Sequence, residues 1–320
     1  MKNLPSISSQ IDEKKIHKII RDNFSVLAPS YFTLTSNWFI RAYKHFKDID
    51  KFIIVIYLVH QDLIFFRKNG VKIDYDTFYK DKTIEIDKIN ISDISKDLLI
   101  PKESVRRKVL SLEKKGIIKK KGKKITIDRS AYNSTQPNDT LKNICTLLSV
   151  FSQILKEEKV IKNEMSSNEI NNLIKHNFSF CWYQFYKFLF PYCLRWKNYF
   201  GDMEIFTILA TIILNNNSKI GRQLKGVDSY LDKWRDKIIN KKIKGINAMS
   251  ISEITGIPRP TVVRKIKKLT KNKFISLDKN KLINFDVSKQ NFKDMSIIQD
   301  ENLKSINVFI KRTYNQINLN

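Results

Sequence analysis

Two short segments of the chain carry apolar residues at the spacing of an amphipathic helix. In residues 101–115, Val105, Val109 and Leu112 stand at i, i+4 and i+7, and residues 258–272 repeat this spacing. Such a spacing places one apolar stripe along one face of a helix. Each segment starts with proline, which is favoured at a helix start because its missing N–H has no intrahelical partner there. Both segments are therefore predicted to be helices with one buried face.

Other elements surround these two helices in the same order. A short helix precedes each of these two helices. After each of them, apolar residues alternate with polar ones on both sides of a basic turn, which predicts a small β-hairpin. Upstream lie an opening helix, an aromatic segment and a long apolar helix, and an amphipathic helix closes each set. The first set comprises helices over 12–24, from Asp48, over 92–98 and 101–115 and over 141–155, with a β-prone piece at 84–86 and a hairpin over 117–127. The second comprises helices over 167–177, from Asp202, over 250–255 and 258–272 and over 303–317, with a weaker β-prone piece near Ile243 and a hairpin over 274–285.

The two sets form an internal repeat. Displaced by 154 residues, residues 19–25 align with 173–179, with four of seven pairs identical. At an offset of 157, residues 100–108 fall on 257–265, and at 162 the starts of the closing helices coincide. The matches keep their order and need only loop-sized gaps between offsets. The chain is therefore interpreted as two copies of one unit of about 150 residues.

Helix, turn, helix and basic hairpin together make a winged helix-turn-helix. We expect a mainly α protein with small β-hairpin wings, in which two tandem winged helix-turn-helix units, each flanked by helices, form a pseudo-dimer. The length of 320 residues agrees with two domains, because one core rarely organises so long a chain. The expected domains are 1–165, with its winged helix at about 48–128, and 166–320, with its winged helix at about 202–286.

Positive charge is concentrated in the two predicted helix–hairpin segments. The chain has 59 Lys and Arg against 32 Asp and Glu, a net charge of +27. Because 47 of the basic residues are Lys, a mix that an AT-rich genome produces, the total alone is weak evidence. Residues 101–124 and 258–281, however, carry +17 of this charge. This distribution indicates a polyanionic partner, although solvated helix faces would also account for it.

The types of residue at the start of each second helix suit base recognition. A recognition helix places its N-terminal residues in the major groove, where Arg can bind guanine with two hydrogen bonds and Ser or Thr can bind a base or a phosphate. Lysines of the hairpins and along the helices would contact phosphates. The residues predicted to contact DNA are Lys102, Ser104, Arg106, Arg107, Lys108, Lys119, Lys120, Lys121 and Lys123 in the first unit, and Arg259, Thr261, Arg264, Lys265, Lys268, Lys279 and Lys281 in the second.

The same segments resemble bacterial winged-helix transcription factors. Residues 102–107 and 259–264 look like the start of the recognition helix in the catabolite activator and related regulators, and residues 112–118 are similar to their link to the wing. Flanking helices on both sides are similar to the MarR type, in which such helices form the dimer interface. The second copy departs from the pattern with Lys273 in place of Gly116. The resemblance implies a transcriptional regulator that binds double-stranded DNA.

No pattern in the chain indicates an enzyme, a cofactor or a metal site. It has no Gly-rich phosphate loop, no GxSxG motif and no metal-spaced cluster. Cys145, Cys181 and Cys193 lack CxxC spacing and are expected to be buried free thiols. Neither a secretory signal nor a stretch long enough to span a membrane is recognisable, so a cytoplasmic location is expected.

The aromatic segment 178–200 holds twelve of the 36 aromatic residues. Core or interface packing is favoured for it over a ligand pocket, and a small-molecule effector has no support from any motif. We therefore expect a sequence-specific, double-stranded-DNA-binding transcriptional regulator that acts as a monomeric pseudo-dimer or a homodimer. The alternatives are a plasmid-type replication initiator with tandem winged helices and a winged-helix scaffold that binds protein and no DNA.

Overall fold

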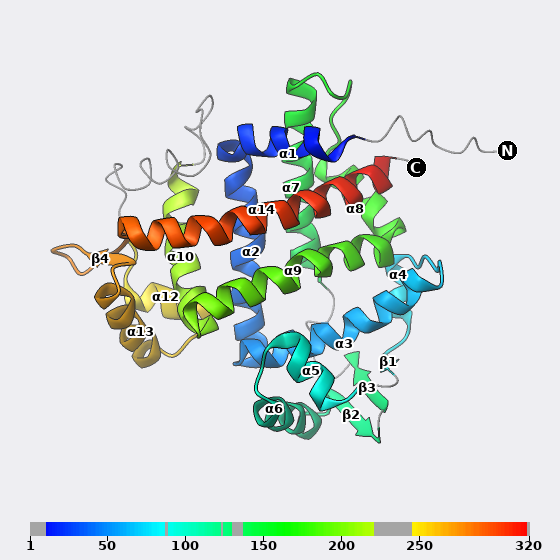
Figure 1. Cartoon of the computed structure of the whole chain (residues 1–320), viewed down its shortest axis with the longest axis horizontal. Helices are drawn as coiled ribbons and strands as arrows, with labels where there is room; N and C mark the ends of the chain where they lie inside the picture. The colour runs from blue at the N-terminus through cyan, green and yellow to red at the C-terminus, as the bar shows by residue number, and fades with distance from the viewer. Residues whose placement is uncertain (1–10, 87–88, 123, 130–136, 221–244, 319–320) are drawn as a thin grey trace.

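The computed structural model describes residues 11–86, 89–122, 124–129, 137–220 and 245–318, and these are mainly helical with two small antiparallel sheets (Figure 1). The first half contains α1 (Glu13–Asp22), α2 (Phe24–Phe46), α3 (Ile49–Lys68), α4 (Tyr75–Lys80), β1 (Thr83–Ile86), α5 (Ile91–Leu98), α6 (Lys102–Lys114), β2 (Ile118–Lys121), β3 (Lys124–Asp128) and α7 (Asn138–Glu157). The second half contains α8 (Ser167–His176), α9 (Phe178–Phe200), α10 (Met203–Ile220), α12 (Ala248–Thr255), α13 (Arg259–Lys271), β4 (Ile275–Leu277), β5 (Ile283–Phe285) and α14 (Lys289–Asn318).

The predicted helices and hairpins are confirmed, most of them with small shifts at their ends, but the closing helix predicted over 303–317 is α14, which begins 14 residues earlier, at Lys289. Each aromatic segment forms a 23-residue helix, α2 in the first half and α9 in the second. The helix predicted over 12–24 ends at Asp22, because Asn23 has left the helical conformation. The β-prone piece near Ile243 lies outside the described residues, but Ile246 beside it forms an isolated bridge with Ile283 of β5.

Acidic residues set the starts of the two long apolar helices, as predicted. The Asp48 side chain accepts a hydrogen bond from the Lys51 N–H and caps α3. Asp202 precedes α10, and its Oδ1 accepts from the Glu204 N–H at 2.8 Å. A carboxylate at this point satisfies a free backbone donor and complements the positive end of the helix dipole.

The helices of the two halves pack in matching pairs. Helix α2 contacts α7 of its own half and α10 of the other, and α9 contacts α14 of its own half and α3 of the other. Helix α1 packs on α14, while α8 packs on α7, so each opening helix lies on the closing helix of the other half. The predicted boundary at 165/166 falls in the loop between α7 and α8, but the buried residues of both halves belong to one core.

Hydrogen bonds also join the two halves through residues far apart in sequence. Ser152 Oγ of α7 lies 3.0 Å from Tyr314 Oη of α14, two positions related by the 162-residue offset. The Ile11 N–H donates to Asn315 Oδ1 at 3.3 Å, and Asn315 Nδ2 donates back to the Ile11 carbonyl at 3.4 Å. The packing of α1 on the closing helix of the other half, α14, is thus held by hydrogen bonds as well as by apolar contacts.

Both hairpins are antiparallel, but they differ in length, because two residues separate β2 from β3 and five separate β4 from β5. Strand β3 lies between β1 and β2, with Ile118 opposite Ile127, and β4 pairs with β5, with Ile275 opposite Phe285. A residue between α6 or α13 and the hairpin that follows it has a positive φ, 70° at Gly116 and 57° at Lys273. Lys273 therefore adopts the left-handed conformation that favours glycine. The chain follows the same path at this point in both halves, although a lysine stands in the second half where the first has a glycine.

Candidate nucleic-acid interface

Each half contains two short helices joined by a turn and followed by a β-hairpin. In Figure 1 the unit of α5, α6, β2 and β3 lies at the lower edge of the molecule, and the unit of α12, α13 and β4 lies at the left edge. The turns are built alike: Ser95 Oγ donates to the Ile100 carbonyl at 2.7 Å, and Ser252 makes the matching bond at 2.7 Å. Left-handed residues end the first helices, with φ of 51° at Leu99 and 73° at Gly256. The second helix of each unit therefore leaves its turn in the same way.

Helices α6 and α13 bury the predicted apolar stripe and expose the opposite face. Val105 and Val262 are fully buried, and the stripe continues along both helices. On the other face, Lys102, Arg106, Arg107, Arg259, Arg264 and Lys268 are exposed, while Ser104 and Thr261 are half-buried. The residues predicted to read bases thus reach solvent in both halves.

The hairpins add further basic residues to each unit. Lys119, Lys120 and Lys121 of β2 are exposed, as are Lys279 and Lys281 in the turn between β4 and β5. The backbone N–H of Lys120 donates to Glu113 Oε1 at 3.0 Å, which ties the first hairpin to the end of α6. Lys123 lies outside the described residues.

Two of the residues predicted to contact DNA take part in ion pairs within the protein. Lys108 Nζ lies 2.5 Å from Asp48 Oδ2 and 3.5 Å from Asp50 Oδ2. Lys265 is 7% exposed and pairs in the same way with Asp202 and with Glu204, the latter at 2.9 Å. Both lysines stand at the edge of the buried stripe and reach toward the acidic start of the long apolar helix. They attach α6 and α13 to the starts of α3 and α10.

The acid pairs are also contacted by the central helix of the other half. Lys197 Nζ of α9 donates to Asp50 at 2.8 Å. In the matching position of α2, burial and the neighbouring Glu204 raise the pKa of Tyr43 to about 12. Helices α6 and α13 are thus each connected, through a lysine and an acid pair, to the helix at the centre of the opposite half.

The sequence contains the signal for these acid pairs. At the 154-residue offset, Asp48 and Asp50 align with Asp202 and Glu204, and the lysines align with each other at the 157-residue offset. A repeated acid pattern together with a repeated lysine indicates a repeated ion pair. This pattern could have predicted both ion pairs.

Replacing Lys265 with methionine should destabilise the protein. Although burial alone would lower it, hydrogen bonds and charges from Asp202 and Glu204 raise the pKa of Lys265. Removing the ammonium leaves these partly buried carboxylates without their partner, at an expected cost of about 1–3 kcal/mol in the free energy of unfolding. Urea denaturation measures this cost. Lys268→Met, an exposed control on the same helix, should change the free energy by less than about 0.5 kcal/mol, and equal effects would contradict the structural role of Lys265.

The cysteines are buried free thiols, as predicted. Burial raises the pKa of the Cys145 thiol to about 12, and it also raises the pKa values of Cys181 and Cys193. They are therefore protonated and poorly nucleophilic at neutral pH. Among the described residues, no group of three or more His, Cys, Asp or Glu side chains could hold a metal ion. No described helix has both the length and the hydropathy required to cross a membrane.

No protein-family model, curated protein sequence or solved structure matches the chain. Its function is therefore inferred from the geometry of the basic two-helix units.

Proposed function

We propose that this protein is a cytoplasmic transcriptional regulator that binds double-stranded DNA through two tandem winged helix-turn-helix units arranged as a pseudo-dimer. The observation that carries the proposal is the pair of basic helix faces on α6 and α13. Arg107 and Arg264 occupy the same position in the two halves and both are exposed. Each helix is anchored from behind by the same lysine–carboxylate cluster.

The charges on these faces are free to meet a polyanion. Arg106 is paired with Glu103 at 3.7 Å, but both side chains are more than 60% exposed, so the pair is weak and easily exchanged for a phosphate or a base. The base-reading residues would enter the major groove, and the hairpin lysines would contact the flanking phosphates. This division of roles accounts for both the exposed arginines and the run of lysines on β2.

The two halves should prefer different base sequences. Glu103 can accept a hydrogen bond from a cytosine amino group, whereas Pro260 at the matched position cannot. Arg106 is likewise matched by Val263, which is exposed on α13. We therefore expect an imperfect inverted repeat in which each half-site is read by one half of a single chain.

Selection of binding sites from random duplexes with the purified full-length chain tests the proposal. We expect two unequal half-sites about 10 base pairs apart, and a complex whose mass corresponds to one chain per duplex. Tight binding to one half-site alone, or an obligatory second chain on each repeat, would contradict the pseudo-dimer. Failure to enrich any sequence at moderate salt would contradict specific DNA binding.

A further inference from the structure

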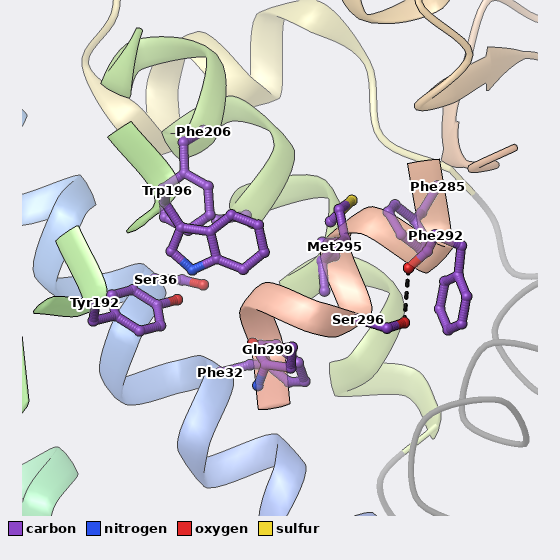
Figure 2. A pocket seen from close by; sticks show the side chains of 12 residues that line it. Phe32, Ser36, Tyr192, Trp196, Phe206, Phe285, Phe292, Met295, Ser296 and Gln299 are labelled. Carbon is purple, nitrogen blue, oxygen red and sulfur yellow. Dashed lines mark hydrogen bonds between the residues drawn. The ribbon is translucent and has the colours of Figure 1, made fainter. Parts of the chain in front are cut away.

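A partly open hollow lies beside the second hairpin. It is bordered by α2, α9, α10, β5 and the first half of α14 (Figure 2). Its cavity volume is about 50 Å³, and about 590 Å³ of empty space is counted when the solvent at its open mouth is included. Rings of Phe32, Trp196, Phe206 and Phe285 and the side chain of Met295 form most of its wall. None of the described residues that line it carries a charge.

Buried hydrogen-bond donors on the wall of the hollow lack partners. Gln299 is 6% exposed, and its Nε2 has no hydrogen-bond partner among the described residues. The indole N–H of Trp196 lies close to the Tyr192 hydroxyl, but it too makes no hydrogen bond of good geometry within the described part of the chain. Figure 2 shows both side chains on the wall of the hollow. Buried donors are rarely left unsatisfied, because the loss of their hydration is costly.

The hollow has a counterpart in the other half of the molecule. A second hollow is lined by Phe52 and Tyr186, which align at the 154-residue offset with Phe206 and Phe32 of the first. The two hollows therefore occupy matching places beside the long apolar helices. A hollow that recurs in this way is a feature of the architecture and not an accident of local packing.

The chemistry of the two hollows differs. Pro137 takes the place of Gln299 at the 162-residue offset, so the second hollow lacks the amide donor. Its wall instead includes Arg41, His45 and Arg129. The unpartnered amide and the wholly uncharged lining are thus specific to the first hollow.

We propose that the first hollow binds a small uncharged molecule with an aromatic body and one acceptor oxygen, such as a carbonyl. The oxygen accepts a hydrogen bond from Gln299 Nε2, and the body lies against the aromatic rings of the wall. A carboxylate is disfavoured, because no described cation lines the hollow to offset the loss of its hydration. This site goes beyond DNA binding and does not depend on it, so it can be tested without DNA.

Three probe molecules test the proposal by isothermal titration of the full-length chain. Acetophenone supplies a ring and a carbonyl, α-methylstyrene has the same shape without the acceptor, and benzoate supplies a charge. We expect one equivalent of acetophenone to bind, with α-methylstyrene and benzoate each at least about tenfold weaker. Absence of acetophenone binding at millimolar concentration, or equal binding of acetophenone and α-methylstyrene, would overturn the proposal.

Variants locate the bound probe. Gln299→Leu should remove the preference for acetophenone over α-methylstyrene, while Gln290→Leu, an exposed position on the same helix, should leave it unchanged. Ala210→Trp places an indole in the hollow and should abolish binding of both probes, with circular dichroism confirming that the variant is folded. A preference that persists in Gln299→Leu, or binding that survives in folded Ala210→Trp, would place the site elsewhere and overturn the assignment.

Discussion

Replacing both Arg107 and Arg264 with alanine should abolish selective DNA binding without unfolding the protein. Arg107 and Arg264 are exposed in the second turn of α6 and of α13, so under the proposed function their loss removes base contacts and leaves the buried stripe intact. One lost bidentate contact costs about 1–3 kcal/mol. If the two sites act independently, the double variant loses roughly 2–6 kcal/mol, which corresponds to about 30-fold to 10⁴-fold in affinity.

Fluorescence anisotropy on the selected duplex and on a scrambled one measures this loss. The double variant should bind the two duplexes almost equally, because phosphate contacts through the hairpin lysines remain. Arg312→Ala, an exposed arginine on α14, serves as the matched control and should behave as the unchanged protein does. Retention of the original preference by the double variant would show that other residues read the bases.

Replacing Phe309 with alanine should destabilise both halves of the molecule together. The ring is 1% exposed and packs between Phe185 and Phe188 of α9, with centroids 5.8 and 6.1 Å away. Removing it leaves a cavity in the shared core at a cost of about 3–5 kcal/mol. Because α9 packs on α3 of the first half as well as on α14, the loss should reach both halves.

Urea denaturation should show a single transition that moves to lower urea. Hydrogen exchange should then speed up in α5 and α6 as well as in α12 and α13. Phe65→Ala, at a side chain that is 60% exposed, is the control and should change the free energy of unfolding by less than about 0.5 kcal/mol. Two transitions, of which only the second-half one moves, would show that the halves unfold independently.

Local pattern predicted most of the elements, because their determinants lie close together in sequence. The stripe through Val105 and Val109, the helix start at Asp48 and the alternation in the hairpins each depend on residues within a few positions of one another. These local patterns can be recognised without knowing which other elements the helix or strand packs against. The repeat extended them to the second half, where single elements are less clear.

The direction of Lys108 and Lys265 could not be predicted from periodicity. Both stand at the edge of the buried stripe, where a long lysine side chain can turn either to solvent or back along the helix. Each lysine turns toward the acidic residues at the start of the long apolar helix. The position of those residues beside the lysine depends on tertiary packing. The packing of α1 on α14 and of α8 on α7 could not be predicted for the same reason, because no local pattern indicates which closing helix an opening helix contacts.

The composition of the aromatic segment favours core packing over a ligand pocket, and most of its rings are buried. Tyr192 and Trp196, however, also line the hollow beside β5. Their role depends on Gln299, which is more than 100 residues away in sequence. A helix-period pattern cannot reveal a feature made jointly by such distant positions.

The exchange of opening helices delays completion of the fold during synthesis. The bonded residues Ile11 and Asn315 are separated by 304 positions, so a ribosome adding about 5–20 residues per second makes them roughly 15–60 s apart. During that interval the surface of α1 that packs on α14 stays uncovered, because α14 has not yet emerged. The nascent chain therefore exposes apolar surface until the end of its synthesis.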